Sequence, residues 1–291
     1  GLNTLFHEGG HAAHFANITQ NAPCFSQEFP PTSMAYAETQ SMFCDSLIGD
    51  ADWLKTYAIA ANGEALPDDL IRTKLEATQP FRAYGERSIL VVPYFERALY
   101  QLPDADLAAE RVLTLARETE NRILGLTCSP RPLLAIPHLL NQESACAYHG
   151  YLLAQMAVYQ TRAHLESELG YLSDNAAIGP LLARHYWSPG NSVGHHDTIR
   201  ALTGQAFSAQ ALSSACNRTV DEAWEAAQAQ IAALDSRKPA AEPAAIGASI
   251  RVVHGDEVIA DNQVSDERMF ADFESWIETR YPSRTGDRKV D

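Results

Sequence analysis

Two histidines at helical spacing stand near the beginning of the chain, in the sequence His7-Glu8-Gly9-Gly10-His11. Residues four apart lie on one face of an α-helix, so both imidazoles can reach the same ion. Glu8 would lie beside that ion without binding it, in place to take a proton from a bound water molecule. Each glycine costs about 1 kcal/mol in a helix interior relative to alanine. The motif therefore predicts a metal-binding helix, capped by Asn3 or Thr4 and running through His14, whose backbone closely approaches a neighbour.

A third metal ligand is predicted on the next helix, expected over about residues 33–48. Zinc sites of this kind use three protein ligands and leave the fourth position to water. Glu38 and Asp45 are seven residues apart and so share a helix face. We expect Glu38 to bind the zinc and Asp45 to accept the other N–H of a ligating histidine, which fixes its tautomer. Two surface carboxylates on an amphipathic helix are the alternative, although the apolar neighbours of both residues favour the site.

A second polar helix face is predicted within residues 143–168. Ser144, Tyr148, Tyr151 and Gln155 fall at i, i+4, i+7 and i+11, among Ala, Leu, Met and Val. A phenol is a good hydrogen-bond donor to a developing oxyanion and stays protonated at neutral pH. A packed aromatic stripe is the alternative. We interpret Cys146 as a small core residue, and we interpret His195-His196-Asp197 as helix surface and core, since adjacent residues diverge around a helix.

Most of the chain has the period of amphipathic helices, and its composition changes near residue 236. We expect a mainly α fold: a helical zinc metallopeptidase region over residues 1–235, a linker over residues 236–246, and a small βα appendage over residues 247–291. The further helices predicted cover residues 82–102, 104–124 and 221–234. In the appendage, strands are predicted over residues 249–253 and 257–260 and a helix over residues 266–280.

Three blocks of sequence resemble the thimet oligopeptidase and oligoendopeptidase F family of zinc metallopeptidases. The first is T-L-F-H-E-G-G-H-A-A-H over residues 4–14 with the Glu38 segment, and the second is Pro137-His138 followed by A-Y-H-G-Y-L over residues 147–152. The third comprises W-S-P-G-N-S over residues 187–192 and L-T-G over residues 202–204. The resemblance covers about residues 1–234. It implies that Tyr151 donates to the oxyanion, supported by Tyr148, with His138 in the same cluster.

The resemblance implies a zinc-dependent endopeptidase for short peptides, with one zinc per chain and a zinc-bound water activated by Glu8. The motif Glu-Gly-Gly-His is more similar to carboxypeptidase Taq, so a metallocarboxypeptidase is one alternative. An inactive, zinc-stabilised binding module is another. Because the zinc motif begins at residue 7, we expect this chain to be the C-terminal part of an enzyme whose N-terminal half is missing here.

Charge and cysteine content limit the partners and the compartment. The net charge of -15 argues against nucleic acid and anionic membranes, because both bind basic surfaces. No apolar run is long enough to cross a bilayer. The five cysteines are scattered and form no Cys-x-x-Cys pair, which is typical of reduced thiols in a cytoplasmic protein. Short peptides are the expected partners.

Overall fold

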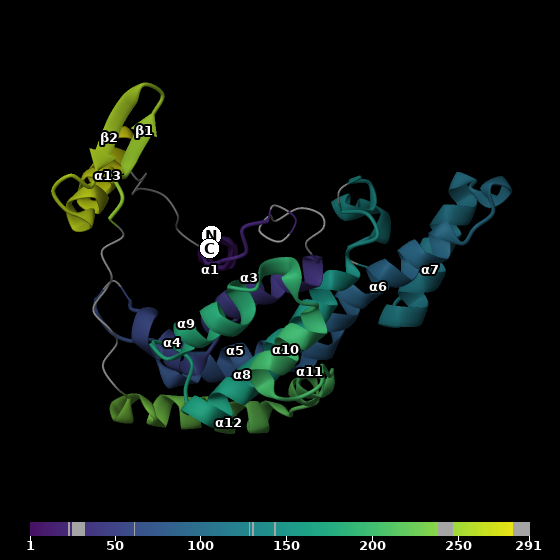
Figure 1. Cartoon of the computed structure of the whole chain (residues 1–291), viewed down its shortest axis with the longest axis horizontal. Helices are drawn as coiled ribbons and strands as arrows, with labels where there is room; N and C mark the ends of the chain where they lie inside the picture. The colour runs from purple at the N-terminus through teal and green to yellow at the C-terminus, as the bar shows by residue number, and fades with distance from the viewer. Residues whose placement is uncertain are drawn as a thin grey trace, which may run out of the picture. The chain divides into compact units, whose positions relative to one another are not determined.

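The chain forms two structural units, and the larger one comprises Gly1–Ala240. Three helices cross at its centre: α1 (Leu2–Ala16), α3 (Met34–Leu47) and α8 (His149–Leu169). In this computed structural model, α3 packs against α1 on one side and against α8 on the other (Figure 1). Helix α1 begins earlier than predicted, because Gly1 and neither Asn3 nor Thr4 is its N-cap residue, and it continues two residues beyond His14. Helix α3 begins and ends within one residue of its prediction. The predicted zinc helix and the predicted Glu38 helix are therefore direct neighbours.

The close contact between α1 and α3 depends on Gly10. A Cβ atom at this position would lie 2.7 Å from Ser41 Cα and 2.9 Å from the Gln40 carbonyl oxygen. Both are backbone atoms, which cannot move without shifting α3. A Cβ atom at Gly9, by contrast, would have none of the other described residues within 4 Å, apart from its chain neighbours and the backbone of its own helix. The close approach expected from the glycine pair thus belongs to Gly10.

The two glycines provide a matched pair of substitutions. Gly10→Ala should push α1 away from α3 and lower the free energy of unfolding by about 1–3 kcal/mol, as overpacking does in cores. Gly9→Ala should raise it by about 0.5–1 kcal/mol, because alanine favours the helix. Chemical denaturation of the metal-free proteins measures both effects without a contribution from zinc binding. Equal stabilities for the two variants would show that the helix crossing does not depend on Gly10.

A second close contact fixes α8 against the beginning of α3. A Cβ atom at Gly150 would lie 2.9 Å from Met34 Cβ and 3.0 Å from Ala35 N. Beyond this contact, α8 runs through an apolar cluster that includes Phe43, Val158 and Leu165. Helix α1, helix α3 and the start of α8 are therefore held together by two glycine contacts and one apolar core.

The predicted start of α8 was wrong. The prediction placed it at residue 143, whereas the helix begins at His149 and residues 144–148 form turns. Cys146 has a φ of +61°, in the left-handed region, which a right-handed helix cannot contain. Ser144 consequently lies on a turn and not on the helix face that carries Tyr151.

Helices α6 (Arg82–Tyr100) and α7 (Ala109–Leu124) form an antiparallel hairpin that projects from the rest of the larger unit (Figure 1). Helix α6 continues through Pro93, and α7 begins later than predicted, after the 3-10 turn η2 (Asp104–Asp106). An apolar cluster between the two helices also takes in Leu133 and Ile136 from the chain that follows α7.

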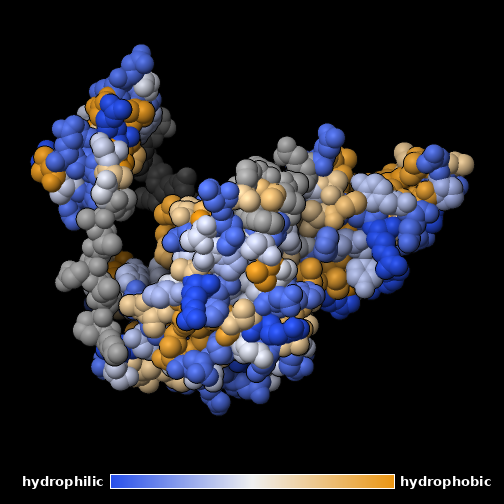
Figure 2. Space-filling model, in the orientation of Figure 1, coloured by the Kyte–Doolittle hydropathy of each residue, from blue (hydrophilic) through white to orange (hydrophobic). Residues whose placement is uncertain are grey.

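The remaining helices of this unit surround these elements. In chain order they are α4 (Ala51–Tyr57), α5 (Asp68–Thr78), η1 (Gln79–Phe81), η3 (Leu133–Ala135), η4 (Pro137–Leu139), α9 (Ile178–Leu182), the π-helix η5 (Ala183–Trp187), η6 (Gly190–Ser192), α10 (His195–Thr203), α11 (Gln210–Cys216), α12 (Val220–Ala232) and η7 (Leu234–Ser236). On the face shown in Figure 2, polar and charged side chains cover most of the unit and apolar side chains form separate patches, with one at the tip of the α6–α7 hairpin.

The structure describes residues 1–22, 24, 33–60, 62–127, 129, 131–142, 144–237 and 247–281. The chain divides into two compact units, Gly1–Ala240 and Ala241–Asp291. Residues 238–246 of the predicted linker lie outside the described residues. Within the described part of the chain, no helix has the length and apolar character needed to cross a bilayer.

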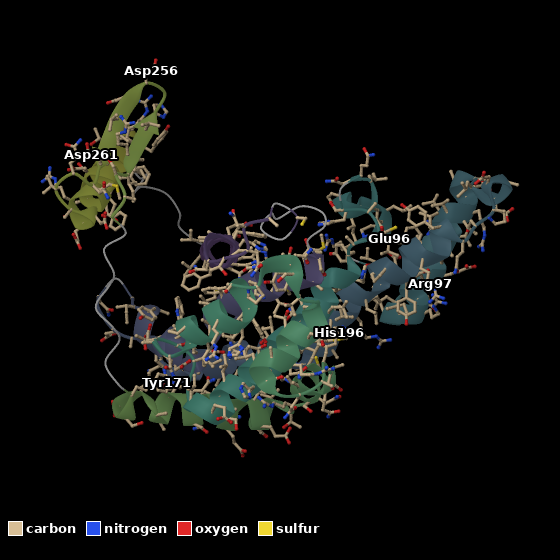
Figure 3. The ribbon with its side chains drawn as sticks, in the orientation of Figure 1. Glu96, Arg97, Tyr171, His196, Asp256 and Asp261 are labelled. Atoms are coloured by element: carbon tan, nitrogen blue, oxygen red, sulfur yellow. The ribbon has the colours of Figure 1, made fainter. Side chains whose placement is uncertain are left out.

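The smaller unit contains the predicted hairpin and helix: β1 (Arg251–His254), β2 (Glu257–Asp261) and α13 (Asp266–Arg280). The strands pair in antiparallel fashion around a turn at Gly255 and Asp256 (Figure 3). Gly255 has a φ of +62°, which glycine adopts without steric cost. Helix α13 packs against β2. Together with the helices above, this is the mainly α fold that the sequence predicts.

Candidate metal centre

Three potential metal ligands converge between α1 and α3. Glu38 Oε2 lies 3.3 Å from His7 Nε2 and 3.7 Å from His11 Nε2. One ligand atom from each residue lies within 4.8 Å of the other two, which makes this the one such cluster among the described residues. Two ligands bound at about 2.0–2.1 Å to one tetrahedral ion lie about 3.3 Å apart. The spacing of the three atoms therefore suits a zinc ion.

The hydrogen bonding of the histidines supports a cation at this point. His7 Nδ1 lies 2.9 Å from Asp45 Oδ2, an arrangement in which Nδ1–H donates to the carboxylate. This tautomer leaves a lone pair on Nε2, facing the Glu38 carboxylate at 3.3 Å. Two acceptors at that distance repel each other unless a cation or a shared proton lies between them. The residues thus fit a metal ion.

Glu38 and Asp45 are both held by their own helix and its neighbours. Glu38 is 9% exposed, and its Oε2 accepts a hydrogen bond from Ser41 Oγ at 3.0 Å. Burial raises the pKa of Asp45, and the hydrogen bond from His7 opposes that rise. Sequence reasoning did not identify Ser41, although a serine three residues after a buried glutamate is a local hydrogen-bond donor on the same helix face.

Glu8 lies on the same helix as the two histidines, and its side chain is exposed. Its negative charge and that of Glu38 both raise the pKa of Tyr151, although burial of the phenol is the largest cause. Tyr151 therefore lies within electrostatic range of both carboxylates, and its pKa rises to about 12. The phenol is protonated, and so a hydrogen-bond donor, throughout the neutral range.

His138, Tyr148 and Tyr151, the three residues that the family resemblance singles out, form one aromatic cluster. His138 Nε2 lies 3.3 Å from Tyr151 Oη. The His138 ring meets both tyrosine rings edge-on, with centroid distances of 5.0 Å to Tyr148 and 5.7 Å to Tyr151. Tyr148 is buried and Tyr151 is half-buried. The structure thus brings the predicted tyrosines together even though Tyr148 precedes α8.

His195 and His196 do not belong to the cluster of converging ligands. His195 Nε2 lies 3.1 Å from Thr39 Oγ1, and burial lowers the His195 pKa to about 4. His196 stacks on Phe207 at 4.5 Å and lies on α10 (Figure 3). Cys146, predicted to be a core residue, is exposed instead, because the turn around it directs it away from the core.

His14 is a residue that sequence reasoning missed. It is fully buried, and both ring nitrogens lack a hydrogen-bond partner within the described part of the chain. Burial lowers its pKa to about 4, with a smaller contribution from His11. Its ring meets Tyr36 edge-on at 4.8 Å, and the Tyr36 hydroxyl donates to the Tyr186 carbonyl oxygen. The signal in the sequence was its position seven residues after His7, on the same helix face.

Comparisons with known proteins identify proteins that this chain is similar to. The sequence model of peptidase family M3 matches residues 1–218. A crystal structure described as BsuCP has the same fold, with a TM-score of 0.55 and 18% sequence identity. The match covers 78% of this chain and 48% of that chain, so this chain spans about half the length of the solved structure. A search of curated proteins found no match.

Proposed function

The chain belongs to peptidase family M3, a family of zinc-dependent metallopeptidases, and we propose that it cleaves short peptides internally. The observation that carries the proposal is the convergence of His7, His11 and Glu38. The Glu8 carboxylate and the Tyr151 phenol complete the chemistry required, since one can move a proton and the other can donate to an oxyanion.

The roles of the individual residues follow from their positions. His7, His11 and Glu38 would hold one zinc ion, with Asp45 fixing the His7 tautomer. When bound, zinc supplies a Lewis acid for the attacking water and the scissile carbonyl. Glu8 takes a proton from the attacking water and delivers it to the leaving amine. Tyr151 donates a hydrogen bond to the carbonyl oxygen as that atom gains negative charge.

The tyrosine and histidine cluster supports this division of roles. The phenol of Tyr151 remains protonated because burial and the nearby carboxylates disfavour its anion. The rings of His138 and Tyr148 both contact the Tyr151 ring. Among the cysteines that the structure describes, Cys24, Cys44, Cys146 and Cys216 are free thiols, which supports a reducing compartment such as the cytoplasm.

A pair of fluorogenic peptides tests the proposal. The peptides have the same sequence, and one ends in a free carboxylate while the other ends in an amide. We expect the zinc-loaded protein to cleave both at an internal bond. A zinc chelator should stop the reaction, and added zinc should restore it.

Two other results would contradict internal cleavage. Release of C-terminal residues from the free-acid peptide alone would identify a carboxypeptidase. Stoichiometric zinc binding without cleavage of either peptide would indicate a zinc-stabilised binding module.

A further inference from the structure

The chain between α7 and α8 carries His138 and Tyr148. In the residues of this segment that the structure describes, the helical parts are the 3-10 turns η3 and η4, of three residues each. Two buried carboxylates on the α6–α7 hairpin hold this segment by its backbone. Glu120 Oε1 accepts a hydrogen bond from Leu133 N at 2.9 Å, and Glu96 Oε1 accepts one from Cys146 N at 2.8 Å. The second contact lies close to the aromatic cluster.

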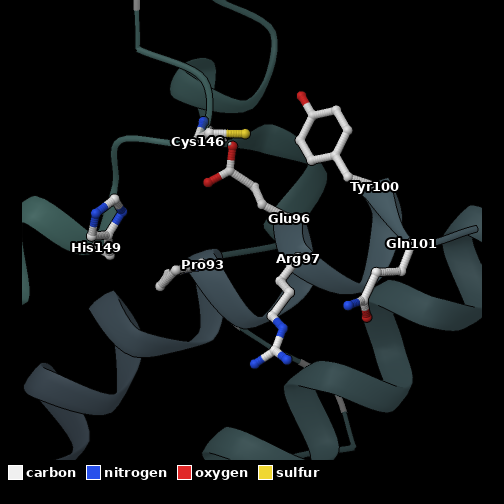
Figure 4. A pocket seen from close by; sticks show the side chains of 7 residues that line it. All are labelled: Pro93, Glu96, Arg97, Tyr100, Gln101, Cys146 and His149. Carbon is white, nitrogen blue, oxygen red and sulfur yellow. Dashed lines mark hydrogen bonds between the residues drawn. The ribbon is translucent and has the colours of Figure 1, made fainter.

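Glu96 holds Cys146 in an unfavourable backbone conformation. Cys146 has a φ of +61°, a conformation that carries a steric cost for any residue other than glycine and persists only where the surroundings enforce it. The hydrogen bond to Glu96 is made by the amide of Cys146 itself. Figure 4 shows the Glu96 carboxylate directed at Cys146, while Arg97, the next residue of α6, points away. The carboxylate therefore stabilises the turn that ends just before α8.

The burial of Glu96 is not explained by packing. Glu96 is 4% exposed and lies beside the apolar cluster residues Val92 and Phe95. Removing a carboxylate from water is costly unless hydrogen bonds compensate, and an apolar side chain would suit this cluster better. A hollow of about 390 Å³ lies beside it, bordered also by Tyr100 and His149. The hydrogen bond to the Cys146 amide is therefore what this buried carboxylate contributes to the fold.

The anchored turn determines where the aromatic cluster lies. Tyr148 follows Cys146 by two residues, and its ring contacts His138 and Tyr151 with centroid distances of 5.0 and 5.1 Å. A change in the backbone at Cys146 would therefore move Tyr148 and release the two side chains that it holds. We propose that Glu96 is a positioning residue, which fixes the Cys146 turn and thereby directs the His138–Tyr148–Tyr151 cluster at the metal centre. Its effect on catalysis rests on the proposed function.

Two substitutions of similar volume separate the hydrogen bond from the packing. Glu96→Gln keeps an acceptor oxygen for the Cys146 amide, whereas Glu96→Met fills the space without one. Arg97→Ala, at the adjacent exposed position, is the control. Hydrogen exchange of a peptide covering residues 137–148 reports on the anchor, and steady-state kinetics with a fluorogenic peptide report on the cluster.

We expect Glu96→Met to speed hydrogen exchange in this segment about tenfold and to lower kcat about 10–10²-fold, with KM and zinc content unchanged. Glu96→Gln and Arg97→Ala should stay within about threefold of the unsubstituted protein. A normal kcat in Glu96→Gln together with a lowered kcat in Glu96→Met would separate positioning from a general loss of stability.

Three results would overturn the inference. Unchanged hydrogen exchange in Glu96→Met would show that the carboxylate does not anchor the turn. Faster exchange with an unchanged kcat would show that the turn does not position the cluster. Equal losses in the Gln and Met variants would mean that the charge, and not the hydrogen bond, matters. Failure of the unsubstituted protein to cleave any peptide would contradict the proposed function instead, and hydrogen exchange would still test the anchor.

Discussion

Glu8→Gln is expected to lower kcat by about 10²–10⁴-fold, the range that general acid–base catalysis contributes. The substitution keeps the shape of the side chain and removes its ability to accept and return a proton. Because Glu8 is exposed on α1 and is not one of the three converging ligands, zinc content should remain at the level of the unsubstituted protein. Steady-state kinetics and metal analysis of the same preparations measure the two effects.

Glu225→Gln is the matched control, since it removes an exposed carboxylate from α12. It should change neither kcat nor zinc content. Loss of zinc in Glu8→Gln would mean that Glu8 is a ligand, and a kcat close to that of the unsubstituted protein would remove it from the reaction.

The convergence of the three candidate metal ligands was predictable from the sequence because much of its geometry is local. His7 and His11 share a helix face by their spacing alone, and so do Glu38 and Asp45. The contact between the two helices is not local. Its one signal was the energetic cost of the glycine pair, and the structure shows that Gly10 supplies the contact.

The beginning of α8 was not predictable from local sequence. The pattern of residues 143–168 favours one helix, yet Cys146 adopts a left-handed conformation. The acceptor that fixes this conformation is Glu96, fifty residues earlier in the chain. Helical periodicity carries no information about such a partner, so the predicted helix began too early.

His14, which is buried, and His195, which is partly buried, show the same limit. Sequence reasoning treated His195 as part of a helix and did not consider His14, and both have a pKa lowered to about 4 by burial. Burial arises from elements that pack on these residues from elsewhere in the chain, as Tyr36 does on His14. The mainly α class was predictable because amphipathic periodicity repeats along the chain.

The second large effect that we expect is the loss of zinc binding when one of the three candidate metal ligands is removed. Glu38→Ala or His11→Ala leaves two of the three converging ligands, and zinc should then be lost during dialysis against a weak chelator. Asp45→Asn keeps all three ligands but alters the partner of His7, so zinc affinity should fall by about 10–100-fold. Asp197→Asn, at an exposed position on α10, should have no effect.

The most direct test of the metal centre is a zinc titration of the metal-free protein against a chromogenic chelator. The predicted result is one zinc per chain for the unsubstituted protein and for Asp197→Asn. Asp45→Asn should bind one zinc more weakly, and Glu38→Ala should bind no zinc in competition with the chelator. Binding of one zinc by Glu38→Ala with unchanged affinity would contradict the assignment of the centre to His7, His11 and Glu38, as would the absence of zinc binding by the unsubstituted protein.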